Sequence, residues 1–269
     1  MTEVIQDNVL NIAIEGSYDD CQNIVKTLLQ NNSFNRKVVS LNSINWLRVM
    51  GQTAYYVWLT KKFTSPINIA IPSGNFGNAY SAWFGRENGL PINEIFCASN
   101  VNDVLTRFIS SGKLEPRETI PSVAPSMDIQ IPSSLERLIY NLEGEASSFY
   151  DQLQSEQIAN LTDKSTAKLQ NIFSSLSFDD EMILNEIELF YKSYGWVIDP
   201  HTATALSSSA SFSSDLPVVG VATASPEKFS NVISKIIAKF TVENEKNEEK
   251  FLVQKPNSSL IENTIKEHL

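Results

Sequence analysis

The sequence is poor in the side chains that build metal centres and disulfide frameworks. Among 269 residues it has two cysteines, Cys21 and Cys97, and two histidines, His201 and His268. Cysteines this far apart, without neighbouring ligands, are typical of buried thiols in a reducing compartment, and two histidines cannot form a zinc site by themselves. We therefore expect no metal site, and the cysteine usage predicts a cytoplasmic protein.

The sequence also lacks a long apolar run and an excess of basic residues. No stretch approaches the roughly 18–20 apolar residues of a membrane span. The opening MTEVIQDN has neither the basic nor the apolar region of a signal peptide. Lys and Arg number 21 against 31 Asp and Glu, which gives a net charge of −10. Neither a membrane nor a nucleic acid is therefore expected as a partner.

The composition of the chain and the pattern of its apolar residues indicate a globular α/β protein. Hydrophobic residues make up 42% of the chain and charged residues 19%, as in proteins with a substantial core. Short apolar strands are predicted to alternate with helices, and the strands are Val9–Ile14, Ile67–Ile71, Glu94–Ala98 and Val218–Ala222. This alternation predicts a mostly parallel sheet flanked by helices.

The stretch INIAIPSGNFG combines a strand, a glycine-containing loop and the start of a helix. The loop Ser73–Gly77 follows the strand, and the helix is expected to begin near Asn78. Free N–H groups and the helix dipole meet at such a helix N-terminus, so the loop can hold an anion. A plain turn between strand and helix is the alternative, and the lone G-x-x-G spacing does not decide between them.

Other polar residues lie where a ligand can be bound. Thr223 follows the last predicted strand, and ligands collect beyond the carboxyl ends of parallel strands. Asn42, Ser43, Asn45 and Arg48 form a second polar cluster, in which the arginine can grip an anion bidentately. A helix cap with a surface arginine explains this second cluster equally well.

The remaining stretches favour structural roles. Residues 162–178 are rich in Ser and Thr and are predicted to be a flexible excursion, whereas 225–240 has the clearest apolar stripe of a helix. Asp199 can cap a helix that begins at Pro200. We interpret His201 as part of this cap rather than as a general base, because no nucleophile accompanies it in the sequence.

Several blocks of the sequence resemble the threonine synthase family of pyridoxal-phosphate enzymes. The blocks, in chain order, are EGSYDDCQNIVK, LNSINWLRVMGQTAYY, SGNFGNAYSAWFGRENGLP, CASNVNDVLTRFISSG, SMDIQIPSSLER, IDPHTATA and VATASPEKF. They extend from about Asn11 to Lys239, so the resemblance covers most of the chain.

The resemblance implies an incomplete version of the fold-type II pyridoxal-phosphate architecture. Residues 1–40 would be the remnant of a small domain, 41–240 the large cofactor-binding domain and 241–269 a charged tail. Asn100 is expected near the cofactor. The residues that the family resemblance assigns to pyridoxal 5'-phosphate are Ser73, Gly74, Asn75, Phe76, Gly77 and Asn78 around the phosphate, and Thr223 at the pyridine nitrogen. Those that it assigns to the substrate are Asn42, Ser43, Asn45 and Arg48.

The activity implied by the resemblance belongs to threonine biosynthesis. A threonine synthase converts the small molecule O-phospho-L-homoserine and water to L-threonine and phosphate, as a lyase acting on a carbon–oxygen bond. The cofactor stabilises the carbanion, and the protein supplies orientation and proton transfer.

One departure from the family pattern affects the chemistry. The family carries its Schiff-base lysine in a segment like HGPT-x-AFKD, followed by an SGDTG loop, and neither occurs here. The chain therefore looks like the carboxyl-terminal part of the enzyme, and we assign it no catalytic lysine. Either a separate polypeptide supplies the missing segment, or the chain is a non-catalytic remnant that binds phosphate, cofactor or a partner. A dinucleotide-binding oxidoreductase is disfavoured because the G-x-G-x-x-G spacing is absent.

Overall fold

The computed structural model describes residues 6–31, 33–42, 45–212, 214–240 and 250–269. By its contacts the chain divides into a first unit, Met1–Asn42 with Val242–Leu269, and a second unit, Ser43–Thr241. Within the described ranges, no helix is both long and apolar enough to cross a membrane.

The second unit is built on a four-stranded parallel sheet. Its strands are β2 (Ile67–Pro72), β3 (Ile92–Ser99), β6 (Phe173–Ser177) and β7 (Val218–Gly220). They follow the order β6-β3-β2-β7, and every neighbouring pair is parallel. This arrangement confirms the predicted α/β fold. A short antiparallel pair lies apart from the sheet and consists of β4 (Lys113–Leu114) and β5 (Ala159–Asn160).

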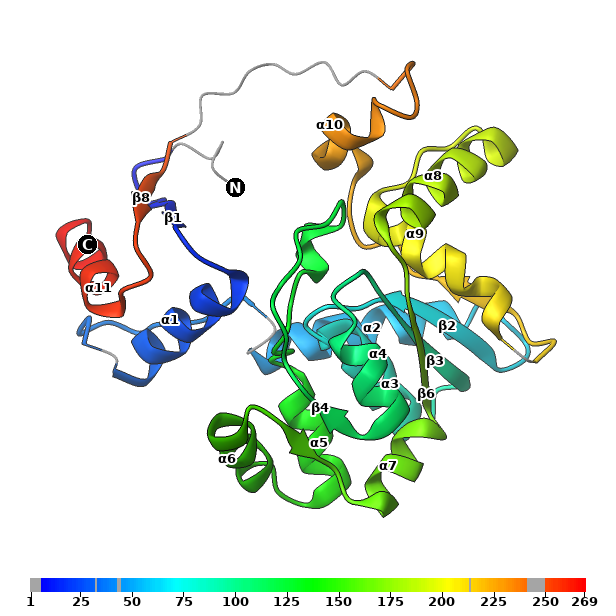
Figure 1. Ribbon diagram of the computed structural model, residues 1–269, viewed down its shortest axis with the longest axis horizontal. Coiled ribbons are helices and arrows are strands. Elements are labelled where there is room, and N and C mark those ends of the chain that lie inside the picture. Colours follow the sequence, from blue (N-terminus) through cyan, green and yellow to red (C-terminus); the bar gives the residue numbers. More distant parts are fainter. Residues whose placement is uncertain (1–5, 32, 43–44, 213, 241–249) are drawn as a thin grey trace. The chain divides into compact units, whose positions relative to one another are not determined.

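Helices cover both faces of the sheet. The α-helices of the second unit are α2 (Trp46–Thr60), α3 (Gly77–Glu87), α4 (Val104–Ser111), α5 (Leu135–Glu143), α6 (Ser147–Glu156), α7 (Asp163–Gln170), α8 (Asp180–Tyr194), α9 (Pro200–Ser207) and α10 (Ser230–Ile233). Its 3-10 helices are η1 (Pro125–Met127), η2 (Ser208–Ser211) and η3 (Pro226–Phe229). One apolar cluster joins the sheet to α2–α7, and another joins it to α8–α10 (Figure 1).

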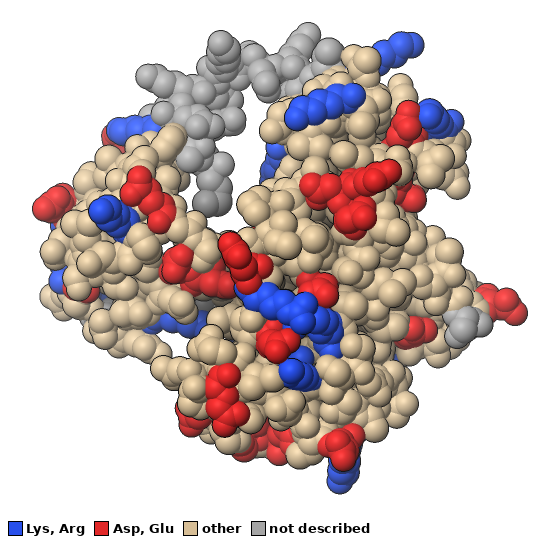
Figure 2. All heavy atoms as spheres, in the orientation of Figure 1, with Lys and Arg blue, Asp and Glu red and all other residues tan. Residues whose placement is uncertain are grey.

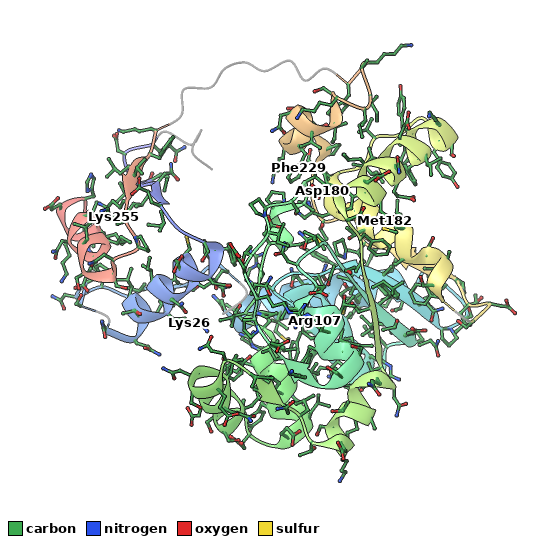
Figure 3. All side chains as sticks on the ribbon, in the orientation of Figure 1. Lys26, Arg107, Asp180, Met182, Phe229 and Lys255 are labelled. Atoms are coloured by element: carbon green, nitrogen blue, oxygen red, sulfur yellow. The ribbon has the colours of Figure 1, made fainter. Side chains whose placement is uncertain are left out.

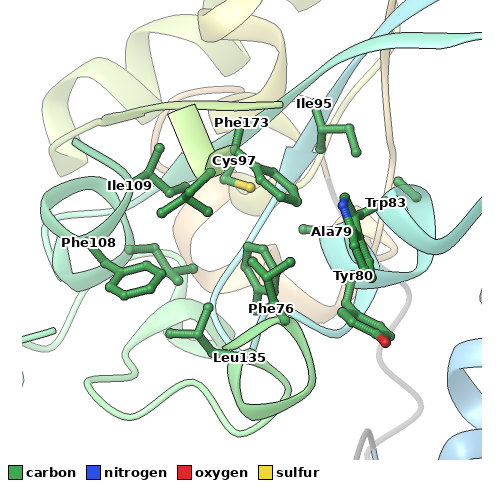
Figure 4. Packing of buried hydrophobic residues seen from close by; sticks show 14 of the residues in the cluster. Phe76, Ala79, Tyr80, Trp83, Ile95, Cys97, Phe108, Ile109, Leu135 and Phe173 are labelled. Atoms are coloured by element: carbon green, nitrogen blue, oxygen red, sulfur yellow. The ribbon is translucent and has the colours of Figure 1, made fainter. Parts of the chain in front are cut away.

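The alternation of side chains along β2 divides these two cores. Ile69 and Ile71 pack into the cluster with α2–α7, whereas Ala70 faces the cluster with α8–α10, as expected when successive side chains point to opposite faces. Just beyond the strand, the Phe76 ring is also buried, with its centroid 5.3 Å from that of Phe173 (Figure 4). The loop after β2 is therefore fixed to the core by its aromatic side chain.

The segment predicted as a flexible excursion, 162–178, instead contains α7 and the edge strand β6. That prediction was wrong because the strand carries serines where alternating apolar residues would mark it. Ser174 donates to the Glu94 carboxylate and Ser175 donates to the Cys97 carbonyl of the neighbouring strand. Pairing with β3 thus stabilises a strand that has little apolar periodicity.

The helix predicted over 225–240 forms only in part, as η3 and α10. Its apolar stripe is nevertheless buried, since Ile233 and Ile237 belong to the cluster with α8–α10 and Phe229 packs against it. The spacing of the apolar residues therefore predicted correctly which side of this segment is buried. Ser230 and Asn231, in the middle of the segment, are residues that do not favour a helix interior.

The first unit joins the two ends of the chain. Strand β1 (Ile12–Ile14) pairs in parallel with β8 (Leu252–Gln254), and Ile24 of α1 (Tyr18–Asn31) packs with Ile261 of α11 (Ser258–Glu267). The described part of the expected tail, 250–269, thus groups with residues up to Asn42. This difference from the sequence-based division arises because β1 and the apolar face of α1 need partners, which the charged composition of the tail does not reveal.

Candidate functional site

The register of the parallel strands brings two expected ligand-binding segments to the same edge of the sheet. Ala70 of β2 lies opposite Gly220 of β7. Ser73 lies three positions after Ala70, and Thr223 lies three positions after Gly220. Both therefore lie just past the carboxyl ends of neighbouring strands. This is the edge at which ligands of parallel sheets bind.

The backbone between β2 and α3 is arranged as an anion-binding turn. Phe76, at the N-cap of α3, has the left-handed conformation (φ 64°, ψ 2°), and no described side chain caps the helix there. Within the described residues, the N–H groups of Gly74, Phe76, Gly77 and Asn78 have no protein acceptor. A left-handed residue at a helix N-terminus leaves successive N–H groups available to an anion. We call Ser73–Asn78 the cradle.

The Ser73 hydroxyl supports the same interpretation. Its side chain is 4% exposed, and its Oγ is buried without a partner among the described residues. Ser99, at the end of the neighbouring strand β3, has a buried Oγ that likewise lacks a partner there. Buried hydroxyls are normally hydrogen-bonded, and an unpaired one is costly. A phosphate group in the cradle would provide the missing acceptor, so the residues present fit such a group.

Gly74 is required for packing as well as for any ligand. A Cβ atom at this position would lie 2.9 Å from both Met127 Cα and Ser126 O. These are backbone atoms of η1 and its neighbourhood, which cannot move aside as the end of a side chain can. The turn at Ser126–Met127 therefore forms a wall directly against the cradle.

The two asparagines of the cradle are engaged with other parts of the protein. Asn75 Oδ1 accepts from Ser133 N (2.9 Å) and Ser133 Oγ (3.0 Å), and the Asn75 carbonyl accepts from Ser134 N (3.1 Å). Asn78 Oδ1 accepts from the Tyr56 hydroxyl at 2.6 Å. Their side-chain oxygens thus hold the loop in shape.

Thr223 is exposed, and its hydroxyl has no hydrogen-bond partner in the part of the chain that the structure describes. One backbone bond beyond β7, from Val221 N to Ala70 O (2.9 Å), keeps this strand end beside β2. The Thr223 hydroxyl therefore follows a strand end that lies beside β2 and is available to a ligand.

The cluster predicted to bind substrate is only partly described. Ser43 lies outside the described residues, and Asn42 belongs to the first unit, where its Oδ1 accepts from Ser40 Oγ at 2.8 Å. Asn45 caps α2 by accepting from Leu47 N at 3.0 Å, and Arg48 is exposed in the first turn. Asn45 therefore performs the capping role that was the alternative interpretation, and anion binding by this cluster stays a prediction.

Asn100 anchors the loop 122–128. Its Nδ2 donates to Asp128 Oδ1 (2.6 Å) and Ser122 Oγ (2.7 Å), and Ser122 N donates to Asp128 Oδ2 (3.1 Å). Asn100 is fully buried. Its side-chain nitrogen is therefore used to shape the loop beside the cradle.

A buried Asp–His pair holds the same loop. His201 Nδ1 lies 2.9 Å from Asp199 Oδ1, and Ser126 N donates to His201 Nε2 at 3.2 Å. Burial by itself would raise the pKa of Asp199, but hydrogen bonds from His201 and Thr202 outweigh it and hold the pKa below its usual value. The sequence analysis found the cap but not the contact with Ser126, which is 75 positions away.

The surface gives an anion little general attraction. Acidic side chains outnumber basic ones by 31 to 21, and Figure 2 shows the two kinds interspersed on the visible face. Binding of phosphate therefore depends on local N–H and hydroxyl donors such as those of the cradle. Within the described ranges, no three His, Cys, Asp or Glu residues form a group that could hold a metal ion.

Comparisons with known proteins find threonine synthases of similar sequence. The chain is 34% identical over 246 residues to a threonine synthase of Pseudomonas aeruginosa, covering 87% of this chain and 52% of that protein. It is 31% identical over 271 residues to the threonine synthase of Saccharomyces cerevisiae, covering 90% of this chain and 53% of that protein. No protein-family model matches the chain.

Solved structures show the same relationship. A pyridoxal-phosphate-bound threonine synthase from Brucella melitensis superposes with a TM-score of 0.83 at 29% identity, covering 97% of this chain and 60% of that one. The yeast enzyme superposes with a TM-score of 0.85 at 27% identity, covering 100% and 61%. The fold is therefore an incomplete fold-type II architecture. The chain is similar to threonine synthases over most of its length, and it spans about half the length of the relatives it matches.

Proposed function

We propose that this chain is the cofactor-phosphate-binding part of a pyridoxal-phosphate-dependent threonine synthase of the cytoplasm. The observation that carries the proposal is the cradle, where backbone N–H groups and the buried Ser73 hydroxyl lack protein acceptors in the described residues. The homology and the pyridoxal phosphate bound to the Brucella relative identify the group that such a cradle suits.

The cradle and Thr223 divide the binding of the cofactor between them. Ser73–Asn78 hold its phosphate through N–H groups and the Ser73 hydroxyl, while Thr223 hydrogen-bonds the pyridine nitrogen. When bound, pyridoxal phosphate supplies an electron sink for a carbanion next to the substrate amine. A neutral hydroxyl at Thr223 positions the ring without the charge that a carboxylate would add.

The substrate proposed for this site is O-phospho-L-homoserine, with L-threonine and phosphate as products. Asn42, Ser43, Asn45 and Arg48 are proposed to contact it, and the exposed guanidinium of Arg48 suits its phosphate. These substrate contacts rest on the resemblance of the NSINWLR block. Residues 1–40 are proposed to be a remnant of the small domain, again by the family resemblance.

The lysine that links covalently to the cofactor is proposed to come from polypeptide outside the 269 residues. None of the lysines here has the family context, and Lys62 lies over the Trp58 ring, 4.6 Å from its centroid. Helix α2 also exposes apolar side chains, with Leu47 at 74%, Tyr55 at 69% and Trp58 at 64%. An apolar helix face of this kind suits a second polypeptide segment.

Two measurements test the proposal. Equilibrium dialysis compares pyridoxal phosphate with pyridoxal, which lacks the phosphate, and we expect weak binding that depends on the phosphate. Phosphate release from O-phospho-L-homoserine should be undetectable with this chain alone. It should appear when the half of the Pseudomonas relative that this chain does not match is added. Equal binding of the two pyridoxal compounds would contradict the cradle assignment.

A non-catalytic role remains the alternative, and the same experiment distinguishes it. Phosphate-dependent binding with no release of phosphate after addition of the second half would indicate a remnant that binds cofactor or partner only. A lysine of this chain that is labelled stoichiometrically by borohydride and required for turnover would overturn the assignment of the lysine to another polypeptide.

A further inference from the structure

His201 is in contact with a backbone amide beside the cradle. The His201 ring is 3% exposed, and its Nε2 accepts from Ser126 N at 3.2 Å. A ring nitrogen that accepts a hydrogen bond carries no proton, so in this arrangement the proton of the neutral ring is on Nδ1. Nδ1 then donates to Asp199 Oδ1, 2.9 Å away.

Asp199 is itself fixed on several sides. It caps α9 by accepting from His201 N at 2.9 Å, and its second oxygen accepts from the Thr202 hydroxyl. The carboxylate therefore holds the imidazole in one tautomer and orientation, which aims Nε2 at Ser126.

The amide that His201 holds belongs to the wall of the cradle. The carbonyl of Ser126 and the Cα of Met127 lie where a Cβ on Gly74 would approach to 2.9 Å. A small rotation of the peptides around Ser126 would therefore press on Gly74 or open a gap beside it.

The same ring contacts the segment that follows Thr223. The centroid of His201 is 4.9 Å from that of Phe229, which ends η3 and is labelled in Figure 3. Helix η3 begins at Pro226, three residues after Thr223. One imidazole thus touches both segments that flank the proposed cofactor contacts.

We propose that His201 is a positioning residue for anion binding, which acts through the Ser126 amide to keep the 126–127 turn against Gly74. Because the cradle is the proposed phosphate site, the proposal deepens the proposed function and rests on it for the identity of the anion. The contacts that link Asp199, His201 and Ser126, which we call the relay, concern this chain alone and are tested without the cofactor.

Two variants separate the contacts of the ring. The amide oxygen of glutamine in His201→Gln can take the place of Nε2 and accept from Ser126, whereas the shorter asparagine in His201→Asn reaches Asp199 but not Ser126. Both variants should fold, because the loop is also held by Asp128 and by a bond from Val123 N to Asp180 Oδ1 (3.1 Å).

Amide hydrogen exchange of the ligand-free protein is the first readout. We expect exchange at the Ser126 amide, which loses its acceptor, to become on the order of tenfold faster in His201→Asn and to stay near wild type in His201→Gln. Titration with inorganic phosphate, followed by the amide resonances of the cradle, should show a dissociation constant raised about tenfold in His201→Asn and little changed in His201→Gln.

The outcomes distinguish this proposal from the proposed function. Equal effects of the two variants on exchange and affinity, or no effect of either, would overturn the relay. If phosphate does not bind the wild-type chain, the proposed function fails, while the exchange data still decide whether His201 positions the turn.

Discussion

The Ser73 hydroxyl is buried without a protein partner in the described residues, so its removal should affect a ligand more than the fold. We expect Ser73→Ala to leave the free energy of unfolding unchanged or raise it by up to about 1 kcal/mol, because an unpaired buried hydroxyl is costly. The affinity for pyridoxal phosphate should fall about tenfold, since a hydrogen bond to a charged group is lost. Urea unfolding and equilibrium dialysis measure the two effects.

Ser81 on α3 provides the matched control. Its Oγ donates to the Gly77 carbonyl at 2.8 Å and so has a partner within the protein. Ser81→Ala should lower the free energy of unfolding by about 1 kcal/mol and leave cofactor affinity unchanged. If Ser73→Ala instead behaves like Ser81→Ala, the Ser73 hydroxyl is structural.

Asp199 should make the fold sensitive to acid. Its pKa in the folded protein lies below the ordinary value of 3.8 because hydrogen bonds from His201 and Thr202 outweigh the effect of burial. A lowered folded pKa contributes stability that is complete above about pH 4 and is lost as the pH falls through the folded pKa. We expect the free energy of unfolding to decline below that pH, and to decline less steeply in Asp199→Asn.

Chemical unfolding of the wild type and of Asp199→Asn, from pH 6 down to pH 2.5, measures how steeply the free energy of unfolding falls with pH. Asparagine keeps an oxygen that can cap α9, so the comparison isolates the charge more than the cap. Parallel curves for the wild type and Asp199→Asn would show that Asp199 has no lowered pKa.

At the scale of elements, the junction of β2, α3 and η1 depends on the absence of a side chain at Gly74. We expect Gly74→Ala to lower the free energy of unfolding by about 1–3 kcal/mol, because a Cβ would lie 2.9 Å from backbone atoms of Ser126 and Met127. The displaced turn should also weaken phosphate binding. Urea unfolding and phosphate titration measure these losses.

Gly51 in the middle of α2 is the matched control. A Cβ there would meet nothing within 4 Å, so Gly51→Ala should raise the free energy of unfolding by about 0.5–1 kcal/mol through its higher helix propensity. A Gly74→Ala protein as stable as Gly51→Ala would mean that η1 can move away from the cradle without cost.

The same elements show where local patterns suffice for prediction. The strand at Ile67–Ile71 and the helix start near Asn78 were correct because alternation, Pro72 and the glycines of the loop are all local signals. Strand β6 was missed because its stability comes from serine hydrogen bonds to β3, which sequence periodicity does not record. The incomplete helix at 225–240 shows that an apolar stripe predicts which side chains are buried more reliably than it predicts a continuous helix.

At the scale of the whole molecule, the two ends of the chain share one small core. Ile261 of α11 is 3% exposed and packs with Ile24 and Leu28 of α1. We expect Ile261→Ala to destabilise the first unit by about 2–4 kcal/mol, as a buried Ile→Ala change leaves a cavity. Hydrogen exchange should become faster in α1, β1 and β8, with little change in the sheet of the second unit.

Leu260, one position earlier, is 46% exposed and is the control, since Leu260→Ala should change exchange little. An equal increase in exchange throughout both units after Ile261→Ala would contradict the division into separate cooperative units. No change in α1 would show that the carboxyl-terminal helix does not stabilise it.

The sequence by itself determined the α/β class, the strand–loop–helix unit at the cradle and the resemblance to threonine synthases. These follow from periodicity, turn residues and short motifs, which act over a few neighbouring positions. Only the tertiary structure decided the strand order, the pairing of β1 with β8, the contact of Ser126 with His201 and the burial of the Ser73 hydroxyl without a partner among the described residues. Each of these depends on which distant segments meet when the chain packs, and no local propensity specifies that choice.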